Sequence, residues 1–169
     1  MPVKLIMGLI SQNPNEFLQI EAALCRHYGE IDFRSRILPF DFTDYYAKEM
    51  GKHLKRRFIG FKRLTSPEKL ARVKLTTNQI ESRRSAAGRR RINIDPGYLT
   101  SAKLVLATTK DFSHRIYLKK GIFAEITLGF SRQSFRAFAW TYPDFRSKEY
   151  IAIFNQLRNI YLNQLKKRC

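Results

Sequence analysis

The sequence lacks the features that define several common protein classes. It has two cysteines, Cys25 and Cys169, which are too few for a disulfide framework and do not have metal-ligand spacing. No apolar run approaches the length of a transmembrane helix, and residues 1–11 carry no signal-peptide cleavage pattern. We therefore expect one domain spanning residues 1–169, without a transmembrane segment, in a reducing cytoplasm.

The short motifs of many nucleotide- and metal-dependent enzymes are also missing. Gly51-Lys52 lacks the partner glycine and the hydroxyl of a GxxxxGK[ST] phosphate loop. The chain has no GxGxxG, GxSxG, HExxH or paired CxxC, and its aromatic residues do not follow the RNP pattern of an RNA-recognition motif. The sequence alone therefore assigns no cofactor, metal, specific reaction or oligomeric state.

Acidic residues are scarce, with 14 Asp and Glu against 32 Lys and Arg, a net charge of +18. The basic residues cluster in segments 52–74, 83–91 and 166–168. Such a surplus favours affinity for polyanions, whether nucleic acid, a phosphorylated ligand or an anionic membrane. A generally basic proteome or plain solubility explains the charge equally well.

Hydrophobic patterning predicts an α+β fold whose first half has the order βαββαβ. The predicted strands are residues 3–10, 31–40, 53–64 and 91–99, and the helices are 16–28, capped by Asn15, and a segment that starts at Ser66. This order is that of a ferredoxin-like sandwich, in which two helices cover one face of a four-stranded antiparallel sheet.

The second half predicts further antiparallel strands in a β-meander and a long C-terminal helix. Residues 101–109 are ambiguous between a short helix and a strand, while 114–118 and 123–130 form a hairpin around the turn at 119–121. Residues 135–142 predict another strand, and residues 147–167 a strongly amphipathic helix.

Residues 91–99, RINIDPGYL, combine a strand pattern with a predicted turn. Asn93 and Asp95 alternate with two isoleucines, so both lie on the strand face away from the main core. Pro96 and Gly97 suit the central positions of a type II turn, which would hold Asp95 rigidly. Asp95 is thus either a turn cap or a preorganised site residue.

The strand of residues 123–130 offers a second carboxylate. Glu125 shares one face with Phe123 and Thr127, whereas Ala124 and Ile126 belong to the more apolar face. We therefore expect Glu125 to point away from the core. On this sheet surface the candidate catalytic or metal-ligating residues are Asp95, Glu125 and His114, and the candidate ligand-binding residues are Lys110, Arg115, Tyr98, Asn93 and Trp140.

Within this set, Lys110 and Arg115 suit a phosphate or carboxylate, while Tyr98 and Trp140 would line the pocket. His114 is one of three histidines, and a lone histidine is more often structural than catalytic.

Two other polar segments are weaker candidates. Asp44 and Glu49 lack a histidine at metal-ligand spacing, and Asp44 equally suits a helix cap. Asn78 and Glu81 lie one helical turn apart, a spacing that favours a solvated helix surface.

Six motifs support a resemblance that covers nearly the whole chain: DFTDYYAKEMG, KLTTNQIE, NIDPGYL, LATTKDFSHRIYL, GIFAEITL and WTYPDF. With them the chain resembles an uncharacterised bacterial family, a domain of unknown function whose members are often labelled "GTP-binding protein". The residues do not support that label, because a phosphate loop is missing and Thr109-Lys110-Asp111 does not match the guanine-reading Asn-Lys-x-Asp. The resemblance implies no established activity, substrate or fold.

Three hypotheses follow for the function. The first is a protein that binds or acts on a small phosphorylated or nucleotide-like anion. The second is a nucleic-acid-binding module that uses the basic segments, in which exposed Trp140 and Tyr142 on the sheet could stack bases. The third is a structural or interaction protein whose motifs merely hold the fold.

Overall fold

The computed structural model describes residues 1–43 and 45–167. Its strands are β1 (Lys4–Ser11), β2 (Ile31–Arg34), β3 (Leu38–Phe40), β4 (Leu54–Phe61), β5 (Asn93–Leu99), β6 (Lys103–Thr108), β7 (Arg115–Lys119), β8 (Ile122–Ser131) and β9 (Ser134–Ala137). Its helices are α1 (Pro14–Tyr28), α2 (Ala47–Met50), α3 (Leu70–Arg83) and α4 (Lys148–Lys166), with short 3₁₀ turns η1 (Pro67–Lys69) and η2 (Asp144–Arg146).

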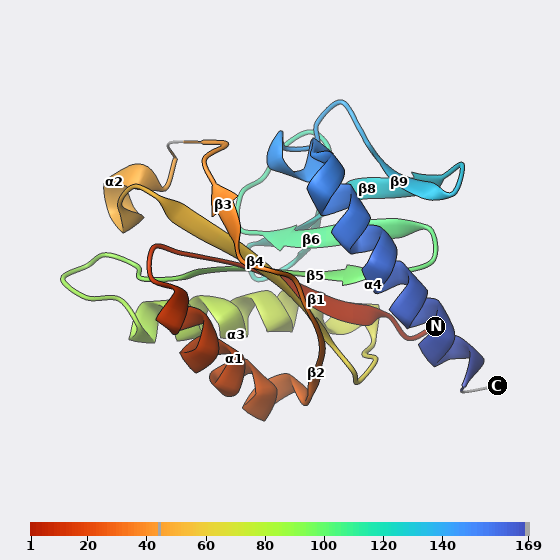
Figure 1. The fold of residues 1–169 in the computed structure, drawn as a ribbon, viewed down its shortest axis with the longest axis horizontal. Coiled ribbons are helices and arrows are strands. Elements are labelled where there is room, and N and C mark those ends of the chain that lie inside the picture. The colour runs from red at the N-terminus through yellow and green to blue at the C-terminus, as the bar shows by residue number, and fades with distance from the viewer. Residues whose placement is uncertain (44, 168–169) are drawn as a thin grey trace.

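The strands form one antiparallel sheet in the order β2-β4-β1-β5-β6-β8-β7, with β3 on β4 and β9 on β8. Its first half, β2-β4-β1-β5, has the strand order of a ferredoxin-like fold, and α1 and α3 lie together on one face (Figure 1). The later strands extend this sheet, and α4 crosses the opposite face (Figure 1). The predicted α+β class, the βαββαβ start and the C-terminal helix are confirmed.

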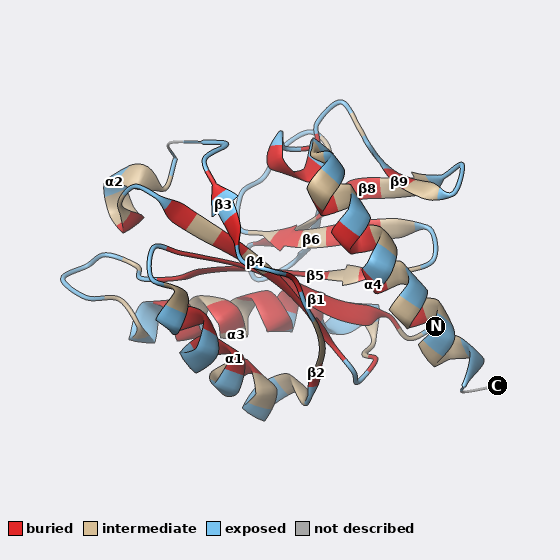
Figure 2. Ribbon diagram, viewed as in Figure 1, coloured by how far each residue is buried: buried red, intermediate tan, exposed pale blue. Residues whose placement is uncertain are grey.

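Helices on both faces bury the central strands. All eight residues of β1 are buried, as Figure 2 shows for the middle of the sheet. Met7 packs toward α1, beside Phe17, whereas Ile6 packs toward α4, beside Leu157. Helix α4 therefore covers part of the sheet face opposite α1 and α3, where it packs against β5 and β9.

The predicted turn at Pro96-Gly97 is wrong, because β5 continues through both residues. Gly97 does not have the positive φ that a type II turn requires. It is needed for close strand approach: a Cβ at this position would collide with the Val105 carbonyl oxygen and lie 2.6 Å from Leu106 Cδ2. Pro96 is tolerated because β5 pairs with β6 only from Gly97 onward. Before that point side chains, not a strand, bond to Ile94, so the missing N–H of Pro96 breaks no hydrogen bond between strands on this edge.

Other predicted boundaries differ from the structure where local geometry interrupts a pattern. Residues 31–40 form two short strands, both paired to β4, instead of one. The ambiguous segment at 101–109 is strand β6, and the strand predicted at 135–142 ends at Ala137, which leaves Trp140 in a turn. Asn13 caps α1 by accepting from Asn15 N, so the predicted cap at Asn15 is wrong by two residues.

The expected faces of β8 are correct only as far as Ile126. The pairing of β6 with β8 shifts register between Leu104 and Val105, and this irregularity breaks the strict alternation of faces along β8. The shift falls after Ile126, so that Thr127 and Leu128 are both buried. Before it, Ile126 is 36% exposed, and Glu125 is buried by its contacts with Arg115 and His114. Glu125 therefore lies inside the protein.

Among the described residues, no helix is long and apolar enough to cross a membrane.

Candidate functional site

The sheet opens between β5 and β6. These strands pair only at Gly97, Tyr98 and Leu99, so residues 93–95 of β5 have no strand beside them on that edge. Helix α3 supplies the missing hydrogen bonds: Lys74 Nζ donates to Ile94 O over 3.1 Å, and Glu81 Oε1 accepts from Ile94 N over 2.6 Å. We call the cavity at this place, which has a volume of about 560 Å³, the sheet opening.

Charged side chains dominate the lining of the sheet opening. They come from β4, β5, α3, the β7–β8 hairpin and the loops around them. The acids are Glu81, Asp95, Glu125 and Asp144, and the basic residues are Arg56, Lys74, Arg90, Lys110 and Arg115. Exposed aromatic rings of Phe42, Tyr45 and Tyr142 stand at the rim. A cavity of this composition suits a polar ligand that carries a planar or apolar group.

Arg56 is the deepest of the basic residues, with 2% of its surface exposed. Its guanidinium donates to Asp95 Oδ2 over 3.3 Å and to Asp144 Oδ2 over 3.1 Å, and lies 4.9 Å from the centre of the Phe40 ring. Burial lowers the pKa of Arg56, but the charges of Asp95, Tyr150 and Asp144 outweigh burial and raise it. Gly8 makes room for this group, because a Cβ there would lie 2.5 Å from Arg56 Nη1.

Asp95 is the most accessible acid of this cluster, with a side chain that is 24% exposed against 9% for Asp144. Burial raises the pKa of Asp144, Arg56 opposes the shift, and the charge of Asp95 adds to it. Burial likewise raises the pKa of Glu81, and Asp95 again adds to it. The charge of Asp95 thus raises the pKa of two neighbouring acids, a coupling of the kind that is common at functional sites.

Arg90 closes one side of the opening. It donates to Glu49 through Nε and Nη2, each over 2.7 Å, and through Nη1 to Glu81 Oε2 over 3.3 Å and Asn93 Oδ1 over 3.0 Å. The hydrogen bond from Arg90 lowers the pKa of Glu49. Glu81, which the sequence placed on a solvated helix surface, is therefore buried and bonded to both β5 and Arg90.

Glu125 and Arg115 form the other side. Arg115 Nε donates to Glu125 Oε2 over 2.8 Å, and its Nη2 donates to Tyr142 Oη over 2.9 Å. Nε2 of His114 lies 3.0 Å from the same Glu125 oxygen. Glu125 thus holds Arg115 at the cavity wall.

Five of the eight candidate site residues line the sheet opening: Asn93, Asp95, Lys110, Arg115 and Glu125. His114 does not line it. Its ring stacks on Trp140 at 5.4 Å, and Trp140 in turn stacks on Phe138 and donates to Ile126 O. Tyr98 points to the opposite sheet face, where it packs beside Leu70 of α3. The expectation that Tyr98 and Trp140 line the pocket is wrong.

The sequence interpretation missed Arg56, Lys74 and Asp144. Arg56 could have been found, because it alternates with Leu54 and Phe58 on an apolar strand face, where a charge needs a buried partner. Asp144 follows a proline in a short 3₁₀ turn, and no local pattern places it beside Arg56.

Three buried polar atoms of the lining residues have no hydrogen-bond partner among the described residues: Arg56 Nε, Asn93 Nδ2 and Glu125 Oε1. Unpartnered buried groups are costly and call for water or a ligand. Two unpartnered donors and one unpartnered acceptor at one cavity therefore indicate that the sheet opening binds water or a polar ligand.

Within the described part of the chain, no three His, Cys, Asp or Glu side chains could together hold a metal ion. Glu49, considered above as a ligand, is paired with Arg90. Asp44, Arg168 and Cys169 lie outside the described residues.

Residues 1–161 match the sequence model of a family described as Domain of unknown function (DUF4416). No curated protein and no solved structure shows significant similarity to the chain.

Proposed function

Because the chain belongs to the DUF4416 family, a domain of unknown function, we propose a function from the geometry of the sheet opening: it binds a small phosphorylated or nucleotide-like anion. The observation that carries the proposal is the convergence of Asn93, Asp95, Lys110, Arg115 and Glu125, from separate segments, on one cavity. These side chains combine an accessible carboxylate, cations and hydrogen-bonding groups within reach of a single small molecule.

The anionic part of the ligand binds at the rim, beside Lys110 and Arg115. The ammonium of Lys110 donates to Tyr45 Oη over 2.6 Å instead of to a carboxylate of the described residues. Arg115 is fixed by Glu125 and Tyr142, so its guanidinium is held in place before the ligand arrives. Such preorganisation reduces the entropy lost on binding.

The planar part of the ligand contacts the rim aromatics. Phe42 is 42% exposed, Tyr45 59% and Tyr142 50%, and all three line the cavity. Stacking of a base on an aromatic side chain contributes about 1–3 kcal/mol. Asp95, deeper in the opening, then accepts from a hydroxyl or amine of the ligand. If the protein is an enzyme, Asp95 is the candidate acid–base residue and Glu125 the positioning residue for Arg115.

A thermal-unfolding screen tests this function. The panel holds nucleoside mono-, di- and triphosphates and sugar phosphates, each with and without Mg²⁺. A ligand at about 100 times its Kd stabilises the folded state by about 2.7 kcal/mol, which corresponds to a Tm increase of roughly 5–10 °C for a domain of this size.

Asp95→Asn and Lys110→Ala should each abolish most of that increase, while the distant Arg72→Ala keeps it. The proposal fails if the complete panel leaves Tm unchanged, or if both site variants respond like the wild type. A loss of stability in Asp95→Asn and Glu125→Gln without any responsive ligand would instead favour the structural role.

A further inference from the structure

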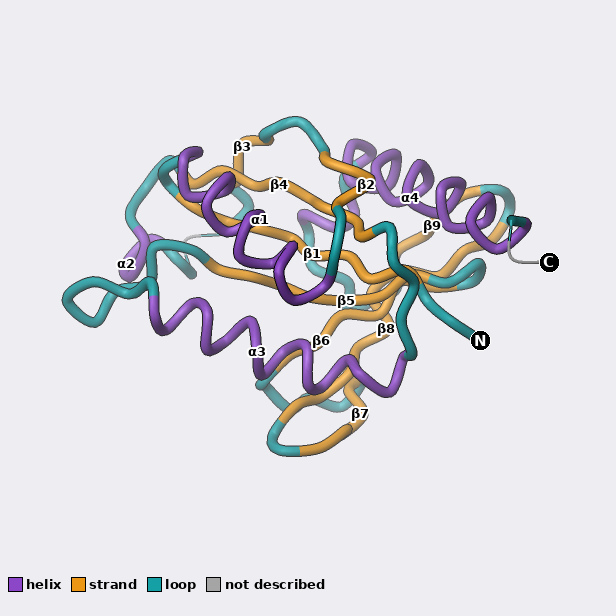
Figure 3. The backbone as a smooth tube through the Cα atoms, turned by 90° about the horizontal axis from the view of Figure 1, so that it is seen from below, coloured by secondary structure: helices purple, strands orange, loops and turns teal. Residues whose placement is uncertain are grey.

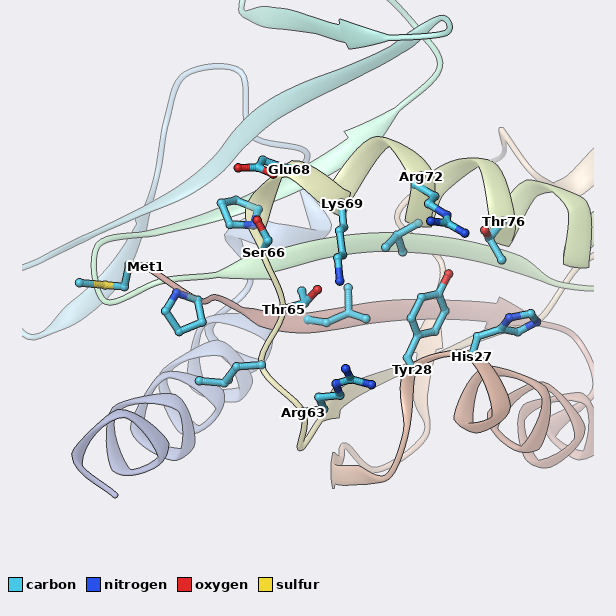
Figure 4. A pocket seen from close by; sticks show the side chains of 15 residues that line it. Met1, His27, Tyr28, Arg63, Thr65, Ser66, Glu68, Lys69, Arg72 and Thr76 are labelled. Carbon is cyan, nitrogen blue, oxygen red and sulfur yellow. The ribbon is translucent and has the colours of Figure 1, made fainter. Parts of the chain in front are cut away.

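A second cavity, of about 600 Å³, lies on the helical side of the sheet at the start of α3. Its walls come from the end of α1, the segment after β4, and the η1–α3 segment (Figure 4). Figure 4 shows Arg63 and Lys69 on opposite sides of it, with Arg72 and Thr76 close to the Tyr28 hydroxyl. It shares no lining residue with the sheet opening.

The basic residues of this cavity are exposed and lack acidic partners. Arg63, Lys69 and Arg72 make no salt bridge with any described residue, and Glu68 is the one acid among the described residues that line the cavity. In contrast, the neighbouring Lys62 pairs with Glu30 over 2.7 Å. Three unpaired cations around one hollow create a local positive potential that attracts phosphate groups.

A similar group of cations lies at the other end of α3. Arg83, Arg84 and Arg91 line a cavity of about 530 Å³ there. Arg84 is held by Glu16 and Gln19 of α1, whereas Arg83 and Arg91 have no acidic partner in the described chain. Since α3 rises 1.5 Å per residue over 14 residues, the two basic cavities are separated by about 20 Å.

Helices α1 and α3 lie beside each other on this face (Figure 3), so both cavities occur along the same pair of helices. We call this surface the helical-face track and define it by Arg63, Lys69, Arg72, Arg83 and Arg91. A free phosphate occupies only one end of such a track. A polymer with regularly spaced phosphates contacts both ends, and about six stacked nucleotides at roughly 3.4 Å each span 20 Å.

The first cavity also offers an apolar surface. Tyr28 is half-buried and packs edge-on against Phe61 at 5.6 Å, and buried Leu5, Leu64 and Val73 lie beneath. A basic groove with an aromatic side chain is the usual way in which proteins bind a single strand without reading its sequence. An aromatic ring among the cations favours a nucleic acid over a lipid surface.

We propose that the helical-face track binds single-stranded nucleic acid, with the phosphates on Arg63, Lys69 and Arg72 at one end and on Arg83 and Arg91 at the other. This binding does not depend on the sheet opening or on the small ligand proposed for it.

Fluorescence anisotropy with labelled 12-nucleotide single-stranded RNA and DNA tests the proposal between 50 and 200 mM NaCl. The track variant is Arg63→Glu, Lys69→Glu and Arg72→Glu together. It should lower the affinity by at least tenfold and reduce the salt slope by about 2, because each lost phosphate contact removes about 0.7 from the slope of a single strand.

A control variant removes the same charge elsewhere. Arg132→Glu, Arg136→Glu and Lys148→Glu change exposed positions in the β8–β9 hairpin and at the start of α4, on the sheet face opposite α1 and α3 (Figure 1). This control should change the affinity by less than about threefold, since it alters only the long-range field. Equal losses in both triple variants would mean general charge attraction and would overturn the proposal.

Two further measurements identify the ligand class. The first is binding to phosphatidylserine vesicles. The nucleic-acid proposal is overturned if the vesicles bind the wild type more tightly than the oligonucleotides do and no longer bind the track variant. The second is competition by inorganic phosphate. If phosphate competes as effectively, per phosphate, as the unlabelled oligonucleotide, the track is a site for single anions, which would contradict the proposal that it binds a nucleic-acid strand.

The same variants separate this proposal from the proposed function. Asp95→Asn should bind the oligonucleotide like the wild type, and the track variant should keep the Tm increase given by the small ligand. If the track variant fails to fold, judged by circular dichroism, the milder Lys69→Ala and Arg72→Ala pair replaces it. That pair should still reduce the salt slope by about 1.4.

Discussion

The sheet opening and the helical-face track are both rich in basic residues, but they use charge in opposite ways. In the opening, Arg56, Arg90 and Arg115 each pair with a carboxylate, and Arg56 is almost wholly buried. In the track, Lys69 and Arg72 are exposed and have no acidic partner among the described residues. Part of the excess positive charge of the protein, +18 in total, is therefore unpaired in the track, whereas carboxylates neutralise the arginines of the opening.

This difference separates two kinds of recognition. Buried pairs hold side chains in fixed positions, and their interaction is little affected by salt, although desolvation makes them costly for the fold. Exposed unpaired cations attract a polyanion over a distance that salt shortens to about 8 Å at physiological ionic strength. We therefore expect mutations in the opening to change stability and shape, and mutations in the track to change mainly salt-dependent binding.

The largest contrast should come from removing one arginine in each region. Arg56→Ala leaves Asp144 buried without its cation and should lower the free energy of unfolding by about 3–5 kcal/mol. Arg72→Ala, at an exposed site, should change it by less than about 0.5 kcal/mol. Urea denaturation of both variants measures the difference.

Arg56→Met tests whether the charge or the packing is responsible. Methionine fills part of the volume between Phe40 and Phe58 but cannot donate to Asp95 or Asp144. If the pairing matters, this variant remains strongly destabilised. Equal stability of Arg56→Met and the wild type would show that Asp95 and Asp144 need no cation, and that the buried pairs do not hold the opening together.

A smaller effect is expected where β5 and β6 first meet. Gly97→Ala places a methyl group against Val105 O and Leu106 Cδ2, so β6 must move and the free energy of unfolding should fall by about 1–3 kcal/mol. The ligand-induced Tm increase should also fall, since the two strands define the opening.

Gly121→Ala is the control for this substitution. Nothing lies within 4 Å of a Cβ at Gly121, so only its positive φ of 73° adds strain, which costs about 1–2 kcal/mol. Its ligand response should match that of the wild type. A Gly97→Ala variant that keeps the full response would show that strand spacing does not define the site.

Much of the fold could be predicted because its signals are local. Apolar residues at helical spacing indicated α1 and α4, a near-continuous apolar run indicated β1, and alternation indicated β4 and β5. The order of these elements was enough for the ferredoxin-like arrangement. The family resemblance agrees with the match over residues 1–161.

The site was predicted only in part, because it depends on contacts between distant segments. Alternation placed Asn93 and Asp95 on one face correctly, but nothing local shows that Lys74 and Glu81 of α3 replace a strand beside Ile94. The register shift that buries both Thr127 and Leu128 depends equally on β6, the partner strand of β8. Pairing partners of this kind are not encoded in one segment.

The smallest predicted effect concerns pH and two acids that share Arg90. Burial raises the pKa of Glu81, and the hydrogen bond from Arg90 lowers the pKa of Glu49. In the unfolded chain Glu81 has a pKa near 4.5, so it ionises at a lower pH there than in the folded protein. Its contribution to stability is therefore complete at low pH and is lost as the pH rises through its raised folded pKa.

Glu49 has the opposite sign. Its contribution is present above 4.5 and is lost as the pH falls through its lowered folded pKa. Relative to the wild type, Glu81→Gln should therefore become less destabilising as the pH rises from 4 to 7. Glu49→Gln should become more destabilising as the pH rises from about 3 to 5, and its effect should then level off.

Urea denaturation across this pH range measures both trends. The hydrogen bond at the strand edge is kept in Glu81→Gln, because the amide oxygen of glutamine can still accept from Ile94 N. Parallel pH trends in the two variants would mean that burial does not govern Glu81, because burial is the largest cause of its raised pKa. Opposite trends would show that the interior of the opening penalises ionised acids. In that case desolvation governs the charges inside the opening, whereas the cations of the track lie on the surface and escape it.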